Sequence, residues 1–483
     1  MGITKVTAQI LNLFLTPMKF GVCNFILAAF LISPLANAQY TKLIDFAGVA
    51  NGSHPHGSLI LQGNVFYGMT YDGGTNNLGT IFKINSDGTG YSKLLDFAGT
   101  TNGSNPLGSL ISDGTFLYGM TRHGGVGSNG VIFKIMPDGS GYTKLLDFGG
   151  SGTGTSPWGS LISDGTFFYG MTYNGGSGTN SNGVIFKIKP DGTELSKLLD
   201  FGTTNGSAPH GSLISDGTSL YGMTYNGGTN NLGTIFKINS DGTGYFKLLD
   251  FAGSTNGRWP NGDLISDGTF LYGMTYSGGT NNYGTIFKIT PDGTGYVKLF
   301  DFLGGINGGS PHGSLISDGT FLYGKTESGG TKSEGIIFKI KPDGTGYSKL
   351  LDLADDSDGI SPTSGSLIFD GAFLYGMTCR GGTNNMGTIF KYGSATGIAE
   401  NNLETDFTVY PNPSKGEINL KINQFETLKM NDVDIYNMFG EKIFEQTLNM
   451  EHETLNLNVS NGIYFLQLKT EEGIASKKLI ITK

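Results

Sequence analysis

Short apolar runs separated by glycine-rich polar stretches recur along most of the chain. In one stretch they are Gly108–Ile111, Phe116–Thr121, Gly130–Ile135 and Tyr142–Phe148. Each run is rich in β-branched, aromatic or aliphatic residues, which favour strands over helices. The pattern therefore predicts four short β-strands in this stretch.

The connections between these runs indicate how the strands pair. Asp113-Gly114 joins the first two and Asp138-Gly139 joins the last two, and Asp-Gly suits the positive φ angles of tight hairpins. A Gly-Gly loop such as Tyr71–Gly79 joins the second and third strands, whereas the link to the next set is longer. Three short connections and one longer crossing are typical of a propeller blade.

The whole four-strand unit is repeated at intervals of 51 or 52 residues. Its marker is the tyrosine of Leu-Tyr-Gly-Met-Thr, which recurs at Tyr67, Tyr118, Tyr169, Tyr221, Tyr272, Tyr323 and Tyr375. The chain opens with an unpartnered fourth strand, Tyr40–Phe46, and its last unit, Gly365–Tyr392, lacks one. We therefore predict an all-β fold: a seven-bladed β-propeller over residues 39–393 with four-stranded blades, whose N-terminal strand closes the last blade. An open solenoid, which would need capping units, is the alternative.

Composition narrows the class further. The 483 residues include 80 glycines, and each glycine inside a helix costs about 1 kcal/mol relative to alanine, so a helical protein is excluded. A disordered chain would not hold 32 Phe and 22 Tyr. The net charge of -9 argues against a nucleic-acid partner, which usually requires a basic face.

The repeated unit GSLISDGTFLYGMT…GG…GTIFKI…DGTGY…KLLDF resembles the GloVer tandem repeat of bacterial surface and exported proteins, across about residues 40–392. The resemblance implies no established enzymatic activity. It also implies a chain that ends in an anchor or sorting segment.

The N-terminus has the pattern of a secretory signal peptide over residues 1–38. Lys19 precedes an apolar run, residues 20–35, which ends in Ala36-Asn37-Ala38. We place cleavage after Ala38, which leaves Gln39 first; Met18 is an alternative start, and an uncleaved membrane anchor is the competing interpretation. No later run approaches the length of a bilayer span, so we expect no transmembrane segment after signal removal.

The composition changes at about Gly393. Residues 394–405 have the character of a linker, and residues 406–483 alternate short apolar strands with Asn-Gly and Phe-Gly turns. This pattern predicts a small antiparallel β-sandwich. Its strand candidates are 417–422, 433–437, 442–446, 455–459, 462–468 and 477–483.

The blocks YPNPSKG, IYNMFGEKI, NGIYFLQL and KKLIITK in this segment are similar to the C-terminal sorting domain of the type IX secretion system. The resemblance implies the type IX machinery as a partner, and a secreted or outer-membrane surface location after Sec export. A plain adhesive sandwich is the alternative. The residues that carry the match are Tyr410, Pro411, Asn412, Pro413, Gly462, Tyr464, Lys477 and Lys478.

Residues that occur in every unit, such as Asp96 and Lys134, must form a symmetric ring around the propeller, which indicates a role in blade structure. Positions that differ among the units are therefore the better candidates for a binding site. The variable position follows a proline just before the first strand, where we expect it near the propeller axis. Aromatic rings together with neutral hydrogen-bonding groups suit sugars, so we predict an extracellular glycan as ligand. The candidate residues at this position are His56, Trp158, His210, Asn261 and His312, and Trp259, which comes just before Pro260, is a further candidate on the same face.

The sequence favours a monomeric binding protein over an enzyme, since no Ser-His-Asp or paired-carboxylate spacing is recognisable. We predict no cofactor, and no metal site, because the ring-spaced histidines come from blades that are not all adjacent. A polysaccharide lyase or hydrolase that uses His123, Arg258 or Glu327 is one alternative. A structural spacer without a small ligand is another. Lys325 also departs from the repeat, since the other units have methionine there.

Overall fold

The computed structural model describes residues 39–177, 182–353, 359–363 and 365–393, and in the C-terminal segment 407–422, 432–437, 442–448, 452–459, 462–470 and 473–481. The predicted signal peptide, residues 1–38 with Ala38, and the predicted linker, 394–405, lie outside the described residues. Gln39 is the first residue of strand β1.

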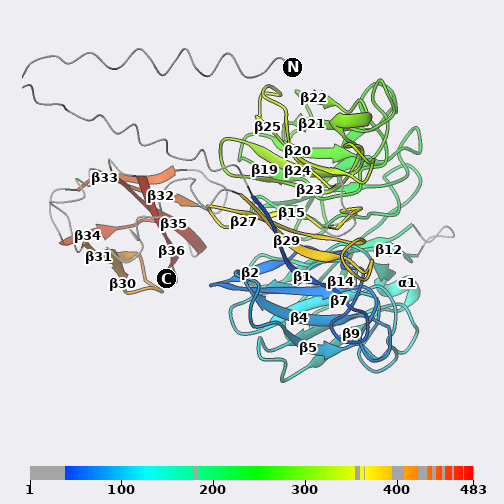
Figure 1. The fold of residues 1–483 in the computed structure, drawn as a ribbon, viewed down its shortest axis with the longest axis horizontal. Coiled ribbons are helices and arrows are strands. Elements are labelled where there is room, and N and C mark those ends of the chain that lie inside the picture. The colour runs from blue at the N-terminus through cyan, green and yellow to red at the C-terminus, as the bar shows by residue number, and fades with distance from the viewer. Residues whose placement is uncertain are drawn as a thin grey trace, which may run out of the picture. The chain divides into compact units, whose positions relative to one another are not determined.

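The strands of residues 39–393 form seven antiparallel sheets (Figure 1). The first sheet has the order β2-β3-β4-β5. Its strands are β2 (Ile60–Gln62), β3 (Val65–Thr70), β4 (Thr80–Asn85) and β5 (Ser92–Asp96).

The next three sheets repeat this order. The second holds β6 (Ile111–Ser112), β7 (Leu117–Thr121), β8 (Val131–Ile135) and β9 (Thr143–Asp147). The third holds β11 (Ile162–Ser163), β12 (Phe168–Asn174), β13 (Val184–Ile188) and β14 (Ser196–Asp200), with β10 (Thr155–Pro157) also on β12. The fourth holds β15 (Ile214–Ser215), β16 (Ser219–Thr224), β17 (Thr234–Asn239) and β18 (Phe246–Asp250).

The fifth sheet holds β19 (Ile265–Ser266), β20 (Leu271–Thr275), β21 (Thr285–Ile289) and β22 (Val297–Asp301). The sixth holds β23 (Gly309–Ser317), β24 (Leu322–Ser328), β25 (Ile336–Ile340) and β26 (Ser348–Asp352). The seventh holds β27 (Ile368–Phe369), β28 (Leu374–Thr378) and β29 (Thr388–Gly393). Two short helical turns, α1 (Gly150–Thr153) and η1 (Gly305–Asn307), lie in crossings between sheets.

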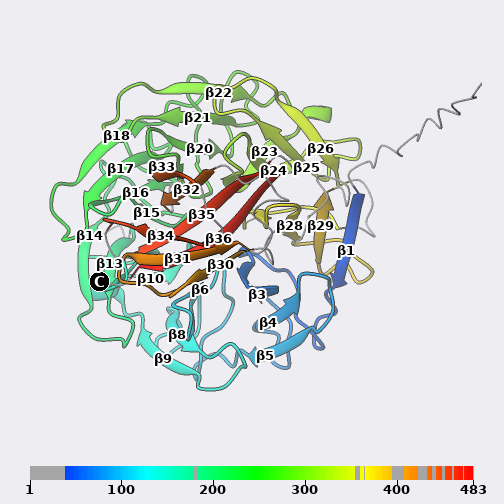
Figure 2. The same cartoon turned by 90° about the vertical axis from the view of Figure 1, so that its left-hand side faces the viewer.

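The seventh sheet is completed by β1 (Gln39–Asp45). β1 pairs with β29 from Gln39 opposite Gly393 to Asp45 opposite Thr388. Figure 2 shows the sheets following one another around a ring, which confirms the predicted all-β propeller and the predicted role of the N-terminal strand.

Several innermost strands are shorter than predicted and begin later, although β23 of the sixth sheet is longer. The run Gly108–Ile111 was expected to be a strand, yet β6 begins only at Ile111. The reason is that Ser109 donates its backbone N–H to the side chain of Ser160 in the next sheet, at 2.7 Å, instead of to a strand of its own sheet. The segments before the inner strands therefore connect neighbouring blades.

The hydrophobic core lies between neighbouring sheets. Tyr67 and Met69 of β3 pack with Leu117 and Phe133 of the following sheet, and all four side chains are buried. Gly68 lies between Tyr67 and Met69 in β3 and leaves room for the ring of Phe82 in β4. A Cβ on Gly68 would lie only 2.5 Å from Phe82 Cζ.

The repeated aspartate of the fourth strand has a structural role. Asp96 accepts hydrogen bonds from the backbone N–H of Thr75 at 3.1 Å and from its hydroxyl at 2.9 Å, and Lys93 Nζ lies 2.9 Å away. Burial alone would raise the pKa of Asp96, but these bonds outweigh it and lower the pKa. The carboxylate thus fixes the loop between the second and third strands to the outer strand.

The C-terminal segment forms two antiparallel sheets around a core of its own. One sheet holds β30 (Phe407–Tyr410), β31 (Glu417–Ile422) and β34 (His452–Asn456). The other has the order β33-β32-β35-β36, with β32 (Asp432–Asn437), β33 (Lys442–Thr447), β35 (Gly462–Thr470) and β36 (Gly473–Ile481). The strand predicted at 455–459 was misplaced, because β34 begins at His452, where it pairs with Lys421 of β31.

Several sorting-motif residues have structural contacts in this segment. Asn412 accepts the backbone N–H of Ile480 at 2.8 Å, and Lys477 donates to the carbonyl of Phe407 at 2.6 Å. Tyr464 is buried in the core, whereas Tyr410 is 48% exposed. The peptide bonds before Pro411 and Pro413 are cis. Gly462 begins β35, and Lys478 follows Lys477 in β36.

No helix in the described part of the chain has the length and apolar character that a bilayer crossing requires.

Candidate functional site

A cavity of about 150 Å³ lies where the inner segments of the sheets meet. The loops between the second and third strands open at the same end of the propeller, because each pairs with a segment just before an inner strand, as Ser104 does with His123. We call this end the cavity face. The predicted site residues that line the cavity are His56, Trp158, His210, Asn261 and His312.

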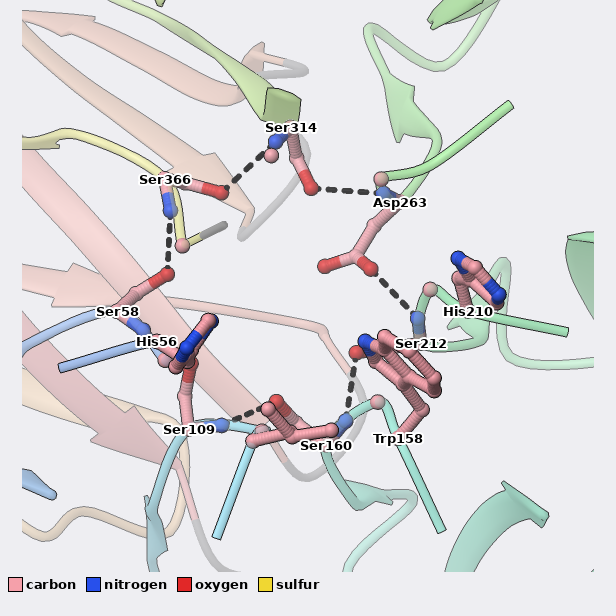
Figure 3. A pocket seen from close by; sticks show the side chains of 18 of the residues that line it. His56, Ser58, Ser109, Trp158, Ser160, His210, Ser212, Asp263, Ser314 and Ser366 are labelled. Carbon is pink, nitrogen blue, oxygen red and sulfur yellow. Dashed lines mark hydrogen bonds between the residues drawn. The ribbon is translucent and has the colours of Figure 1, made fainter. Parts of the chain in front are cut away.

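The floor of the cavity is a closed ring of hydrogen bonds (Figure 3). In each sheet a backbone N–H donates to the side chain that holds the same position in the next sheet, at 2.5 to 3.2 Å. Ser366 donates to Ser58, which joins the last sheet to the first. The members are Ser58, Ser109, Ser160, Ser212, Asp263, Ser314 and Ser366.

One member breaks the symmetry of this ring. Asp263 stands where the other sheets have serine, and one of its oxygens accepts the N–H of Ser212. Figure 3 shows its second oxygen directed toward the middle of the ring. Burial raises the pKa of this carboxyl, although hydrogen bonds from Ser212 and Ser314 act in the opposite direction.

Above the floor, four rings from three sheets form an aromatic stack, which we define as Trp158, His210, Tyr225 and Trp259. The imidazole of His210 lies between the indole of Trp158, at a centroid distance of 4.2 Å, and the ring of Tyr225, at 4.1 Å. Tyr225 is in turn 5.9 Å from Trp259, with the planes 13° apart. Such offset stacking is favourable beyond the area that it buries.

Arginines cover both ends of the aromatic stack. The guanidinium of Arg122 lies 4.6 Å from the ring of Trp158, and that of Arg258 lies 4.2 Å from the ring of Trp259. Each indole of the stack therefore contacts both an aromatic ring and a cationic guanidinium.

Trp259, predicted as a ligand-binding residue of the same face, is not among the residues that line the cavity. It precedes Pro260 and adopts φ of 58°, in the left-handed region that is unusual for a bulky residue. The equivalent position in other sheets holds small or polar residues such as Ser156 and Ala208, with similar φ. The backbone turn places the indole over Tyr225 instead of at the axis.

A polar relay lies on the other side of His210. His210 Nδ1 is 2.7 Å from Asn261 Oδ1, and Asn261 Nδ2 is 3.1 Å from His312 Nδ1. His312 Nε2 is 3.2 Å from a carboxylate oxygen of Glu327. Because an amide oxygen only accepts and an amide nitrogen only donates, His210 donates from Nδ1, while His312 accepts at Nδ1 and donates from Nε2.

Two histidines of the cavity, His56 and His210, are held in the neutral form. Burial lowers the pKa of both His56 and His210 to about 4, with smaller contributions from neighbouring positive groups. The hydrogen bond from His312 lowers the pKa of Glu327. Neutral imidazoles can donate and accept at once, which suits recognition of hydroxyl groups.

Two further titratable groups lie near the seventh sheet. Cys379 Sγ is 3.7 Å from His56 Nε2, and burial raises the pKa of this thiol. Lys325 of β24 is 2% exposed, and burial lowers its pKa to about 7. Both groups are therefore held toward their neutral forms near neutral pH.

Sequence reasoning missed one layer of the site. Tyr173, Tyr225 and Arg122 follow the repeated Met-Thr of the second strand, and each packs against a residue of the predicted set. The signal was available, since this position differs among units as much as the predicted positions do. It holds Tyr71, Arg122, Tyr173, Tyr225, Tyr276, Glu327 and Cys379.

The residues of the alternative enzymatic interpretation are not brought together at the cavity. His123, Arg258 and Glu327 come from three different sheets, and none of them lines the cavity. Among the described residues, no group of three or more His, Cys, Asp or Glu side chains is arranged to hold a metal ion.

Comparison with known families adds the following. The Gloeobacter/Verrucomicrobia repeat, the GloVer repeat, matches residues 28–177, 177–347 and 305–421. The secretion system C-terminal sorting domain matches residues 408–482. These matches confirm the predicted repeats and the predicted type IX sorting domain, which indicates export to a cell-surface or secreted location. No curated protein matches the sequence.

Several solved structures are similar at low identity. PorZ, an essential surface component of the type IX secretion system of Porphyromonas gingivalis, is 13% identical with a TM-score of 0.44, over 91% of this chain and 61% of its own. The extracellular domain of BT4673 from B. thetaiotaomicron is 12% identical with a TM-score of 0.49, over 93% and 58%. An oligogalacturonate lyase in complex with manganese is 13% identical with a TM-score of 0.47, over 74% and 98%. The chain thus spans less than two thirds of the first two proteins, and the similarity concerns the fold alone.

Proposed function

The chain belongs to the Gloeobacter/Verrucomicrobia repeat family, and we propose that its propeller is a carbohydrate-binding module that acts outside the cell. The observation that carries the proposal is the clustering of non-repeated residues around one cavity. A scaffold of near-identical units that served only as a spacer would have no reason to gather both of its tryptophans and most of its histidines at one end.

The chemistry of the lining suits a polyhydroxylated ligand. Asn261 and the neutral imidazoles of His56 and His210 supply donors and acceptors. Leu107 and Trp158 supply apolar surface. Aromatic ring edges carry partial positive charge and attract hydroxyl oxygens, so aromatic residues near the cavity suit such a ligand.

The size of the cavity indicates how such a ligand sits. Its volume of about 150 Å³ is below the roughly 300–1,000 Å³ of pockets that enclose a drug-sized molecule. We therefore expect one sugar residue to enter the cavity while the rest of the chain lies across the cavity face.

A glycan array probed with the mature protein tests the proposal. We expect Trp158→Ala and Asn261→Ala to reduce binding at least about tenfold, since each removes a group at the cavity wall. Phe246→Ala is the matched control, because Phe246 is 58% exposed on the outer strand β18. Thermal unfolding should show that all variants are folded. Absence of binding, or binding that neither of the two cavity changes affects, would refute the proposal.

A further inference from the structure

The chain holds three arginines, Arg122, Arg258 and Arg380, and all three lie in loops of the cavity face. Arg122 follows β7, Arg258 pairs with the loop residue Ser277, and Arg380 pairs with Ile360. Lysines, by contrast, are distributed over the strands of every sheet. Arginine is the residue type best suited to bind planar anions such as carboxylates, and here it occurs only at the end of the propeller that carries the cavity.

The positive charge of two of these arginines is not balanced by protein carboxylates. Fourth-strand lysines pair with the aspartate three residues on, as Lys93 does with Asp96 at 2.9 Å. Within the described part of the chain, neither Arg122 nor Arg258 forms such an ion pair. Arg122 Nε is buried there without a hydrogen-bond partner, and Arg258 Nε reaches only the hydroxyl of Ser277, at 3.3 Å.

Both guanidinium groups lie over an aromatic ring. Arg122 lies over Trp158 and Arg258 over Trp259, so each indole holds a guanidinium by its face. The N–H donors of arginine lie in the guanidinium plane and form a fork that matches carboxylate and sulfate oxygens. Stacking therefore orients this fork without occupying it.

The nearby acidic groups do not cancel this charge at the rim. Glu327 is engaged by His312 on the opposite side of His210, and Asp72 lies 3.4 Å from His54. Asp263 lies in the floor of the cavity, where its carboxylate would disfavour a second negative charge. An anionic ligand is thus directed with its neutral part into the cavity and its charges toward the two arginines.

We propose that the ligand is an acidic saccharide, one that carries carboxylate or sulfate groups, and that Arg122 and Arg258 bind these groups at the two ends of the aromatic stack. This inference rests on the proposed carbohydrate-binding function and narrows its ligand class.

Binding of the mature protein to polygalacturonate, dextran sulfate and neutral dextran tests the inference. We expect binding to polygalacturonate or to dextran sulfate, weakened by added salt, and little binding to dextran. The polymer that binds identifies the anionic group. Arg122→Gln and Arg258→Gln should each lower the affinity about tenfold or more, as expected for loss of charge-assisted hydrogen bonds. Arg122→Lys should restore only part of it, because lysine lacks the planar fork.

Lys134→Gln is the matched control. Lys134 also lies over an aromatic ring, that of Phe116, at 4.8 Å, but at the hairpin end of its sheet, away from the cavity face. Its removal should change the affinity less than twofold. Binding to neutral dextran that is insensitive to both arginine changes would overturn the inference and leave the carbohydrate proposal intact. Failure to bind any saccharide would overturn both.

Discussion

The imidazole of His210 and the indole of Trp158 lie face to face, with centroids 4.2 Å apart and planes 5° apart. The two residues hold the same position in neighbouring repeats, so the repeat itself places them side by side. Tyr225 covers the second face of His210 at 4.1 Å. This repeat position contributes to an extended stack because it holds an aromatic ring in two adjacent sheets, Trp158 in one and His210 in the next.

This contact should be measurable as a coupling energy. Stability changes for Trp158→Ala, His210→Ala and the double variant, measured by chemical unfolding, should reveal a coupling of about 0.5–1.5 kcal/mol. The pair Trp158→Ala with Phe246→Ala should be additive, because Phe246 lies on an outer strand. Additivity of the Trp158 and His210 changes would show that the stacking contributes nothing.

The neutral histidines predict a dependence of stability on pH. In the folded protein the pKa of His56 and of His210 is about 4, below the ordinary value of 6.5. Between pH 4 and pH 6.5 the unfolded chain therefore binds more protons than the folded protein does. Stability is retained above pH 6.5 and is lost as the pH falls toward 4, by up to about 3 kcal/mol per histidine.

Unfolding of His56→Gln and His210→Gln at pH 7 and pH 4.5 checks this dependence. Each variant should lose less stability on acidification than the wild-type protein does. His452→Gln, at an exposed position of β34, should lose as much as the wild type. Equal losses in all four proteins would contradict the assignment.

Replacement of Lys325 by methionine, the residue of the other repeats, should stabilise the protein. The folded pKa of Lys325 is about 7, below 10.5, so stability is lost as the pH falls from 10.5 through 7, because the unfolded chain takes up the proton first. The gain from Lys325→Met should be on the order of 2–4 kcal/mol at pH 7 and smaller at pH 9.5. Lys339→Met, in the same sheet, is the control and should show no such trend.

The glycines before the floor ring should tolerate no side chain. A Cβ on Gly159 would lie 2.3 Å from the carbonyl oxygen of Gly211 in the next sheet, whereas a Cβ on Gly149 would meet nothing within 4 Å. We expect Gly159→Ala to destabilise the protein by roughly 2–4 kcal/mol, measured by chemical unfolding, and Gly149→Ala to have little effect. Similar effects of both changes would argue against close contact around the axis.

Export should depend on the C-terminal segment. Deletion of residues 406–483 should retain the protein in the periplasm, because the sorting domain is what the secretion machinery recognises. Cell fractionation and protease accessibility at the surface provide the measurement. A full-length Phe246→Ala protein, displayed normally, controls for expression. Surface display of the truncated chain would contradict the sorting role.

The sequence by itself determined the propeller and much of its cavity. A repeat of 51 or 52 residues, with an unpartnered strand at one end and a missing strand at the other, leaves ring closure as the simplest way to satisfy every strand. Since the repeat also fixes which position of each unit lies nearest the axis, five of the six predicted residues line the cavity.

Only the tertiary structure decided how those residues use their surfaces. His210 and Arg122, from the two adjacent sheets, lie 4.2 Å and 4.6 Å from the indole of Trp158. Trp259 lies 5.9 Å from Tyr225 and does not line the cavity, whereas Asn261, two residues on, does. Both outcomes depend on contacts between residues that are distant in the chain, which periodicity along one unit does not encode.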